Sequence, residues 1–317
     1  MDIQTSLHNL EFYKRYIQFQ QHIENYFQNK QYLKIDLPVL SPALIPESYL
    51  KIFETEFTYF DKKEKLYLTP SPELFLKRLL VYGIGNCYYL GKSFRNAEPD
   101  SDLHSFEFTM LEFYKVNADY MDIAEEVLNM LRFIAEKLKY KKISFSKWEK
   151  ITVAEAFQKY SHVNEKELFD KKLFIQKVKE KKYKIDGFTY EDIFSQIYVH
   201  EIEPHLGKNG FPTLIYDYPK QFAALAKLNP DGKTAQRFEF YIDGIELGDC
   251  FSELTDWKEQ EDRFNKQKVL HRIDKGFIKA LQYGLKDCAG IAIGVERLGL
   301  IFTGVKRIQD LKLITIG

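Results

Sequence analysis

The sequence is poor in cysteine. Only three of its 317 residues are cysteines, Cys87, Cys250 and Cys288, and no two of them have CxxC spacing. An odd and scattered set gives no support to a disulfide framework or a zinc site, and it is typical of a reducing compartment.

Net charge and long hydrophobic runs are absent as well. The chain has 46 Lys and Arg residues against 46 Asp and Glu residues, so its formal net charge is zero. That balance argues against a broad basic surface that wraps nucleic acid, although a local patch stays compatible with it. The N-terminus lacks the basic-then-apolar pattern of a signal peptide, and no apolar run approaches the length of a membrane span. We therefore expect a cytoplasmic protein without a membrane partner.

What the chain does have is an ordinary globular composition, with 45% hydrophobic and 29% charged residues. Helical periodicity predicts helices at 9–29, 72–83 and 119–138, and Asp119 is placed to cap the last of them. Apolar runs predict strands at 67–69, 87–94, 106–114, 213–218, 237–247 and the start of 290–302, and a short strand within 32–44. This pattern indicates an α+β fold, with a mainly antiparallel sheet flanked by helices.

The stretch from about 141 to 212 is rich in lysine and is interpreted as a helical insertion. We interpret its lysines as a solvent-exposed helix face, and a patch that binds nucleic acid is the more specific alternative. No internal repeat or long linker divides the chain, so we expect a single domain over residues 1–317.

Ser71-Pro72-Glu73 comes directly before the second predicted helix. A carboxylate at this place can bind a substrate ammonium group. The same three residues also make an ordinary helix start, because Ser caps, Pro suits the first turn and Glu complements the helix dipole. Both roles can coexist.

The segment 94–114 places Arg95 at the end of one strand and Phe108 on the returning strand. A guanidinium group binds phosphate bidentately and a ring face stacks on adenine, so the pair could grip a nucleotide. By periodicity alone, a plain surface hairpin is the simpler interpretation.

Two later segments carry further candidate groups. Glu246 and Glu253 are seven positions apart, and both can face one cavity if a turn or a bulge intervenes; one could hold Mg²⁺ and the other a substrate amine. Exposed charges on an edge strand are the alternative.

In 290–298, small residues alternate along a strand that ends near Arg297, an arrangement that lets a ligand approach the backbone. Such a glycine run is weak evidence by itself.

Order and spacing make these segments specific. The early strand ending in proline, the hairpin FRN…HSFEFTMLEFY and the late segment GIAIGVERL resemble motifs 1, 2 and 3 of class II aminoacyl-tRNA synthetases. SPELFLKRLLV, FRN and FEFTMLEFY resemble the lysyl-tRNA synthetase branch in particular. The resemblance runs from about Leu10 to the C-terminus.

The chain also resembles a truncated group within that branch, the elongation factor P–(R)-β-lysine ligase family. The first motif begins within about forty residues, which leaves no room for the anticodon-reading OB-fold of lysyl-tRNA synthetases. The stretch 218–256 is similar to the ligases over its full length, and Ala292 agrees with them where the synthetases usually have Gly. The resemblance implies ATP-dependent activation of lysine or (R)-β-lysine as an acyl-adenylate. Transfer to a lysine side chain of elongation factor P would follow.

The resemblance also implies roles for single residues. Arg95 would bind the α-phosphate and Arg297 the γ-phosphate, as the two catalytic groups, and Phe108 would stack on adenine. Glu246 would help to hold Mg²⁺ with ATP. The implied nucleotide site consists of Arg95, Asn96, Glu98, His104, Phe108, Glu246, Leu247, Gly294 and Arg297. The implied amino-acid site consists of Ser71, Pro72, Glu73, Tyr114, Glu253 and Ala292.

The departures from the family pattern fall in one loop. Ala97 stands where the family usually has Glu, and Glu98 follows one position later. Acidic residues, Asp100 and Asp102, replace the usual basic residue. An acidic loop near a triphosphate repels it, so ATP affinity or the choice of acceptor would differ. His104 could donate to a phosphate, or be a plain loop histidine.

Two other functions remain open at this point. The chain could charge tRNA or another carrier with lysine, although the neutral charge argues against tRNA as a partner. It could also be a non-catalytic regulatory paralogue that binds an amino acid or a nucleotide, which the unusual loop at 97–106 would suit. The resemblance further implies a homodimer, since motif 1 usually lies at the subunit interface.

Overall fold

The computed structural model describes residues 1–46, 50–97, 101–267 and 269–316. Its centre is an eight-stranded sheet with the strand order β2-β6-β7-β12-β11-β10-β9-β8. The strands are β2 (Leu33–Lys34), β6 (Cys87–Phe94), β7 (Glu107–Val116), β8 (Glu149–Thr152), β9 (Thr213–Pro219), β10 (Thr234–Ile242), β11 (Ile245–Ser252) and β12 (Cys288–Gly294). Only the outermost pairs, β2 with β6 and β8 with β9, are parallel. The predicted α+β fold with a mainly antiparallel sheet is confirmed.

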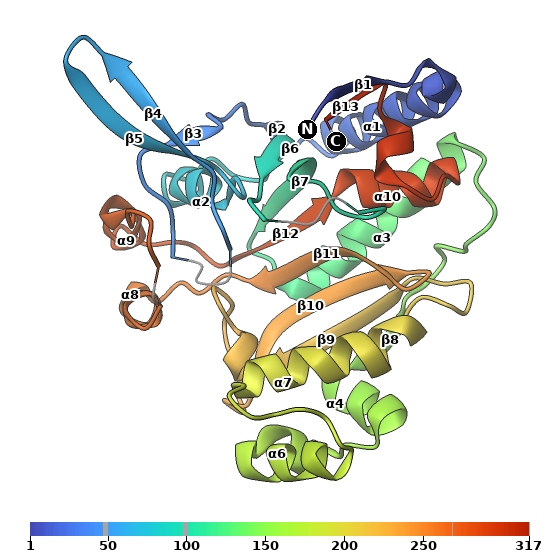
Figure 1. Ribbon diagram of the computed structural model, residues 1–317, viewed down its shortest axis with the longest axis vertical. Coiled ribbons are helices and arrows are strands. Elements are labelled where there is room, and N and C mark those ends of the chain that lie inside the picture. Colours follow the sequence, from blue (N-terminus) through green and yellow to red (C-terminus); the bar gives the residue numbers. More distant parts are fainter. Residues whose placement is uncertain (47–49, 98–100, 268, 317) are drawn as a thin grey trace.

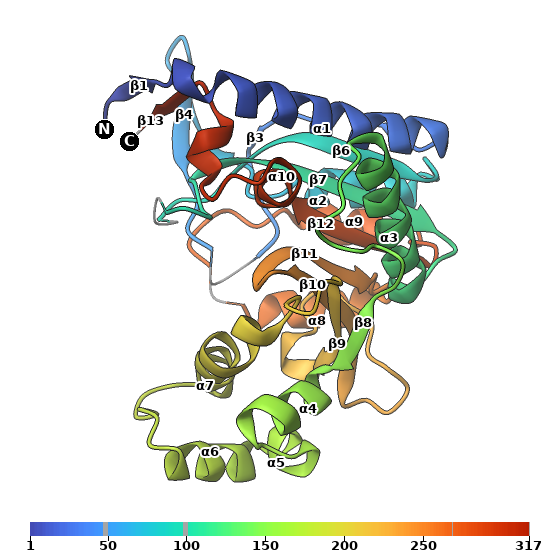
Figure 2. The same cartoon turned by 90° about the vertical axis from the view of Figure 1, so that its right-hand side faces the viewer.

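Three helices cover one face of the sheet (Figures 1 and 2). They are α1 (Leu10–Asn29), α3 (Tyr120–Lys137) and α10 (Val295–Thr303). Their apolar stripes pack on alternate strand residues such as Leu111, Phe113 and Ile291 and form the main hydrophobic core. Asp119 caps α3 through a capping box, as the sequence predicted. This face of the sheet is therefore closed by packing.

The opposite face is bordered by α2 (Glu73–Val81), α8 (Trp257–Asn265) and α9 (Lys275–Leu281). Residues of these helices pack with Tyr114 and Cys288 in a second core. The helices cover only part of the face, and the polar residues described below occupy the rest.

The predicted helical insertion forms a small helical unit beneath β8 and β9 (Figure 1). It contains α4 (Val153–Ala156), α5 (Glu165–Phe169), α6 (Lys171–Glu180) and α7 (Tyr190–Ile197), with π-helical turns at Phe157–Ser161 and Tyr198–Ile202. It has a hydrophobic core of its own. The prediction was wrong at one end, because β8 lies within 141–212 and belongs to the main sheet.

The prediction of one strand over 237–247 was also wrong. The segment is a hairpin of β10 and β11, and it turns at Asp243 and Gly244, whose φ angles are +56° and +78°. Two consecutive residues with positive φ are what a tight hairpin turn requires, and Asp-Gly is a favoured sequence for it. A register shift next to Tyr241 adds a bulge to the hairpin.

The remaining elements lie at the periphery. Only 67–69 was predicted as a strand here, whereas a projecting hairpin of β4 (Glu54–Tyr59) and β5 (Lys62–Leu68) is present and pairs with β3 (Leu40–Ser41). The two ends of the chain meet in a ribbon of β1 (Ile3–Thr5) and β13 (Ile314–Ile316). Short 3₁₀ turns occur at Leu7–Asn9, Glu203–His205, Lys220–Phe222 and Ile308–Leu311. No helix in the described ranges is both long and apolar enough to cross a bilayer.

Candidate active site

A row of polar residues crosses the uncovered face of the sheet. The strand registers align Tyr89 with Glu112, Glu112 with Ala292, Ala292 with Asp249, and Asp249 with Glu239. Residues directly opposite one another on neighbouring strands project to the same face. Three carboxylates from three different strands therefore lie on one surface, and the methyl group of Ala292 lies between two of them.

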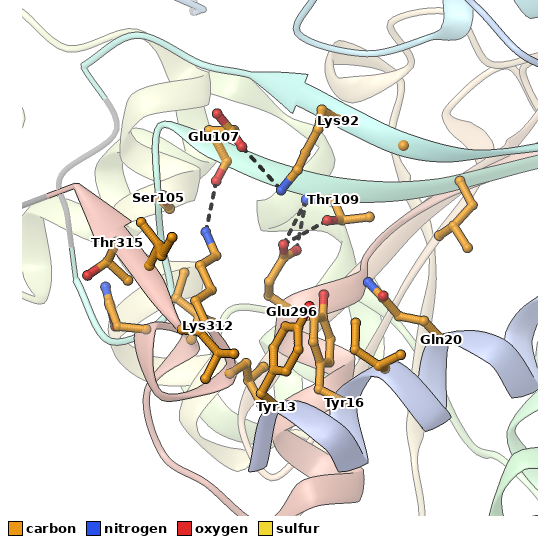
Figure 3. A pocket seen from close by; sticks show the side chains of 18 of the residues that line it. Tyr13, Tyr16, Gln20, Lys92, Ser105, Glu107, Thr109, Glu296, Lys312 and Thr315 are labelled. Carbon is orange, nitrogen blue, oxygen red and sulfur yellow. Dashed lines mark hydrogen bonds and ion pairs between the residues drawn. The ribbon is translucent and has the colours of Figure 1, made fainter. Parts of the chain in front are cut away.

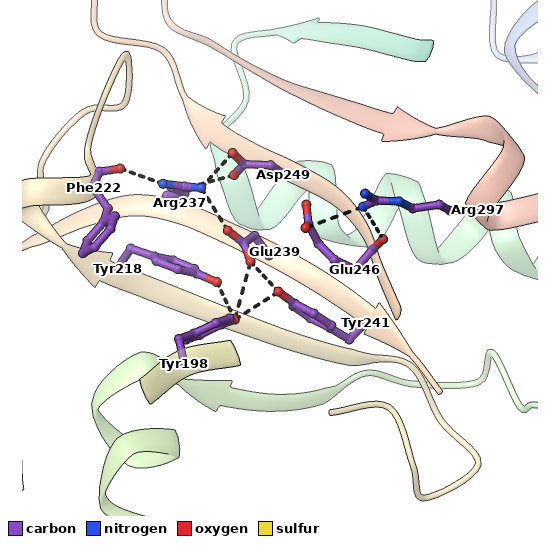
Figure 4. A network of polar contacts seen from close by, with 9 residues as sticks. All are labelled: Tyr198, Tyr218, Phe222, Arg237, Glu239, Tyr241, Glu246, Asp249 and Arg297. Carbon is purple, nitrogen blue, oxygen red and sulfur yellow. Dashed lines mark hydrogen bonds and ion pairs between the residues drawn. The ribbon is translucent and has the colours of Figure 1, made fainter. Parts of the chain in front are cut away.

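Arg237 bridges the two carboxylates at one end of this row (Figure 4). Its guanidinium donates to both carboxylate oxygens of Asp249, at 2.8 and 2.9 Å, and to Oε1 of Glu239 at 2.9 Å. The hydroxyl of Tyr241 donates to the other oxygen of Glu239 at 2.7 Å. These contacts fix the two carboxylates in place and leave one negative charge in excess.

The other end of the row is a buried cluster of acidic side chains, which we name the acidic pocket. Glu73, at the start of α2, and Glu253, just after β11, both form ion pairs with the ammonium group of Lys77, at 2.5 Å for Glu253. All three side chains are buried. One oxygen of Glu253, Oε2, contacts Lys77, whereas Oε1 has no hydrogen-bond partner among the described residues. Because buried polar groups are normally hydrogen-bonded, a ligand could supply a donor to Oε1.

Glu112 faces into the same pocket from β7. Its Oε1 accepts a hydrogen bond from the hydroxyl of Tyr114 at 2.8 Å, and its Oε2 is 3.4 Å from Oγ of Ser71. Ser71 Oγ also accepts the backbone N–H of Glu73 at 3.0 Å. The Ser71-Pro72-Glu73 segment therefore starts the helix and lies in an acidic cluster, and its binding of a substrate ammonium group stays a prediction.

Burial makes these carboxyl groups poor at holding charge while the pocket contains no further cation. Burial raises the pKa of Glu253 to about 8; Lys77 opposes the shift and Glu73 adds to it. The pKa of Glu112 is also raised, by burial and then by Glu73. Burial would lower the pKa of Lys77, but the charges of Glu253 and Glu73 outweigh it, so the ammonium group stays charged.

Arg297, in the first turn of α10, reaches the loop between β6 and β7. Its guanidinium donates to the carbonyl of Leu103 at 3.1 Å and to Nε2 of His104 at 2.7 Å. Because an arginine only donates, that nitrogen accepts, and the opposite ring nitrogen can then donate to Ser101 Oγ at 3.0 Å. Arg297 also donates to the carbonyl of Glu246 and lies 3.6 Å from its carboxylate.

Glu246 adds a further acid beside Glu239. It opposes Tyr241 across the β10–β11 bulge, so it projects to the same face as Asp249. Although 40% of its side-chain surface is exposed, loss of solvent in this concave face raises its pKa, Glu239 raises it further, and Arg297 opposes the shift. The bulge is the irregularity that the sequence argument required for Glu246 and Glu253 to share a face.

Arg95 lies at the opposite side of the same loop. Its backbone N–H donates to Phe106 at 3.0 Å, and its guanidinium lies over the ring of Phe108 with the carbon 5.4 Å from the ring centre. The next residue, Asn96, pairs with Lys51 at the base of the projecting hairpin. Arg95 and Arg297 therefore border one loop, and Phe108 lies beside it.

Several predicted residues have other surroundings than expected. The side chain of Leu247 packs in the main core on the far face, so only its backbone is available to a nucleotide. Pro72 is buried behind Glu73, while Gly294 borders Arg297. Gly290 does not leave room for a ligand, because a Cβ there would lie 2.4 Å from the ring of Tyr114. Glu98 and Asp100 lie outside the described residues.

Sequence reasoning missed half of the acidic face: Lys77, Glu112, Arg237, Glu239 and Asp249. Two signals could have found some of them. Lys77 lies four residues after Glu73 on a predicted helix, and Glu112 lies two residues before Tyr114 on a predicted strand. The row across five strands depends on strand order and register, which no local pattern provides.

A separate open groove of about 1010 Å³ lies on the other side of the sheet (Figure 3). It is lined by α1, by the ends of β6 and β7, and by the C-terminal segment. Glu296 lies at its base and accepts the backbone N–H and the hydroxyl of Thr109. None of the predicted site residues lines this groove, so it is distinct from the acidic face.

The comparisons with known proteins cover nearly the whole chain. Residues 2–314 match the family described as tRNA synthetases class II (D, K and N). A protein named elongation factor P–(R)-beta-lysine ligase from Proteus mirabilis is 35% identical over 306 residues, which are 91% of this chain and 90% of that protein. Proteins of the same name from Avibacterium paragallinarum and Buchnera aphidicola are 36% and 33% identical, and cover 91% and 88% of this chain and 90% and 87% of their own lengths.

Proposed function

Because the chain belongs to the class II tRNA synthetases (D, K and N), within the group of the elongation factor P–(R)-beta-lysine ligases, we propose that it activates lysine or (R)-β-lysine. Its membership of this family makes it an ATP-dependent amino acid ligase. In this proposal the amino acid becomes an acyl-adenylate and is then transferred to a lysine side chain of elongation factor P.

The observation that carries the choice of substrate is the excess of acid on the uncovered face. Six carboxylates lie there, those of Glu73, Glu112, Glu239, Glu246, Asp249 and Glu253, against the three cations of Lys77, Arg237 and Arg297. Buried carboxylates without paired cations are unfavourable. The face therefore suits a ligand set rich in positive charge, such as a diamino acid together with a metal ion.

Activation needs alignment more than a protein nucleophile. The substrate carboxylate attacks the α-phosphorus of ATP and pyrophosphate leaves. Arg95 would bind the α-phosphate and Arg297 the γ-phosphate, where their fixed charges stabilise the charge that develops. Phe108 would stack on the adenine. For this to happen, ATP has to replace His104 and Leu103 as the partner of Arg297.

The oxygen donors at the β10–β11 hairpin fit Mg²⁺, which prefers carboxylate ligands. Glu246 would hold it, with Glu239 beside it, and the ion would neutralise phosphate charge when bound. Arg237 and Tyr241 keep Glu239 oriented for this role.

The acceptor amine meets the adenylate in the second step. A primary amine displaces AMP from the acyl carbon, forms an amide and releases a proton. Elongation factor P is proposed as the acceptor because the relatives are named for it.

A homodimer is also proposed. The outer side of α1 and the neighbouring segment expose apolar side chains: Leu10, Ile17, Leu33 and Leu40. Such a surface suits burial against a second copy. Light scattering coupled to size exclusion should give twice the chain mass, and Ile17→Asp should shift it toward the monomer.

The test of the proposed function is ATP–pyrophosphate exchange. Exchange should depend on lysine or (R)-β-lysine. If none of the amino acids tested supports exchange, a regulatory paralogue is favoured. Mass spectrometry of elongation factor P, run beside labelled tRNA as an acceptor, then separates protein ligation from tRNA charging. Transfer to tRNA alone would contradict the proposal.

A further inference from the structure

Lys77 is an ionised lysine enclosed in the amino-acid pocket. Only 2% of its surface is exposed. It lies one helical turn after Glu73, so both residues project from the same side of α2. Its ammonium group contacts the carboxylates of Glu73 and Glu253 and lies over the ring of Phe251, 5.1 Å from its centre. A group this costly to bury needs a reason beyond anchoring a helix.

We propose that Lys77 is a specificity-determining residue, whose ammonium group balances one of the two charges of the Glu73–Glu253 pair and so directs the side-chain ammonium of a diamino acid to Glu112. This inference rests on the proposed function and adds to it a residue that selects for the second ammonium group of the substrate. Lys77 acts as a positioning residue, because it acts on the substrate through the acids that it pairs.

The number of charges in the pocket supports this assignment. When all three acids are ionised, Glu73, Glu112 and Glu253 supply three negative charges and Lys77 supplies one positive charge, which leaves two negative charges for a ligand to balance. A diamino acid brings two ammonium groups, while its carboxylate points toward ATP and reacts. A monoamino acid would leave one buried carboxylate without a cation, which is unfavourable.

The hydrogen-bond capacity of the acids agrees with the charge count. A carboxylate has about four acceptor sites, and Glu112 uses two at most, with Tyr114 and Ser71. Oε2 of Glu253 contacts Lys77, and its Oε1 has no hydrogen-bond donor among the described residues. Glu112 and Glu253 can therefore both accept from a substrate while Lys77 remains in place.

The first test is Lys77→Met, assayed by ATP–pyrophosphate exchange between pH 6.5 and 9. Lys77 is the charge that lowers the pKa of Glu253, so without it this carboxyl holds its proton at neutral pH and no longer binds the substrate's amine. The value of kcat/KM for the diamino acid should fall about tenfold or more at pH 7, because one partner of a buried ion network is lost. It should recover toward pH 9, and the KM for ATP should stay within about twofold of wild type. Lys181→Met removes a partly buried, ion-paired lysine from the helical unit and is the matched control.

Amine rescue distinguishes this role from a structural one. In Lys77→Ala, propylammonium should restore activity at least about threefold, because it fits the space of the missing side chain, whereas the bulkier tert-butylammonium should not. Thermal unfolding checks that each variant is folded. If neither variant folds, the wild-type enzyme still provides a test, because norleucine should support exchange at least about a hundredfold less well than lysine.

Three results would overturn the inference. The first is a loss of activity that is equal at every pH in Lys77→Met and is not restored by amines in Lys77→Ala. The second is an activity of Lys77→Met within about twofold of wild type. The third is equal use of norleucine and lysine by the wild-type enzyme. A wild-type enzyme that exchanges with no diamino acid would overturn the proposed function as well. An active wild-type enzyme with unaffected variants would overturn only the role of Lys77.

Discussion

The two ends of the acidic face are built differently. The proposed amino-acid pocket consists of buried side chains on α2, on β7 and just after β11, such as Glu73, Glu112 and Glu253. The proposed nucleotide end consists of partly exposed groups around a loop, with Arg297 held by Leu103 and His104. In this proposal the pocket is formed before the substrate binds, whereas the nucleotide end must exchange protein contacts for ATP. We expect substitutions in the pocket to change the choice of amino acid, and substitutions at the loop to change the use of ATP.

The largest effect is expected at the nucleotide end. Arg297→Ala removes a fixed charge from the place where phosphate charge develops, so exchange should fall on the order of 10²- to 10³-fold. Lys181→Met is the control for folding. If Arg297→Ala exchanges at the wild-type rate, Arg297 does not bind the nucleotide, and the two regions do not differ in the way described.

The next effect belongs to the pocket. Glu112→Gln keeps the size of the side chain but removes the charge that receives an ammonium group. The value of kcat/KM for the amino acid should fall by about 10- to 100-fold, with KM for ATP unchanged, since hydrogen bonds to charged groups are the stronger ones. A loss that appears only in the KM for ATP would contradict the division of the face.

A pH titration sharpens the same comparison. Burial raises the pKa of Glu253 to about 8, so its carboxyl holds a proton below that pH. An ammonium group binds the ionised form, so affinity for the amino acid is full above pH 8. It is lost as the pH falls, by up to about tenfold per pH unit. Glu253→Gln should flatten this dependence, and a pH dependence that survives in that variant would assign it to another group.

The smallest effect is expected from His104→Ala. His104 contacts Arg297 where ATP is proposed to bind, so removing it should lower the KM for ATP by about two- to fivefold and leave kcat unchanged, in keeping with the loss of one hydrogen bond. A higher KM for ATP would instead mean that His104 binds the nucleotide directly, as the family resemblance implies.

Local patterns were sufficient for several of the central elements. The strand at 87–94 and the capped helix after Asp119 follow from periodicity and capping, which involve only neighbouring residues. The hairpin within 237–247 was missed although Asp243-Gly244 is a turn signal, because the flanking apolar residues continue the strand pattern on both sides.

The sequence by itself determined that an α+β domain carries arginines and acids in the order typical of a class II synthetase. Only the tertiary structure decided that Glu112, Asp249 and Glu239 form one row and that Lys77 lies between Glu73 and Glu253. The physical reason is that charges interact across strands and between a helix and a sheet. Their pairing is set by strand order, register and a bulge, which involve residues far apart in the chain.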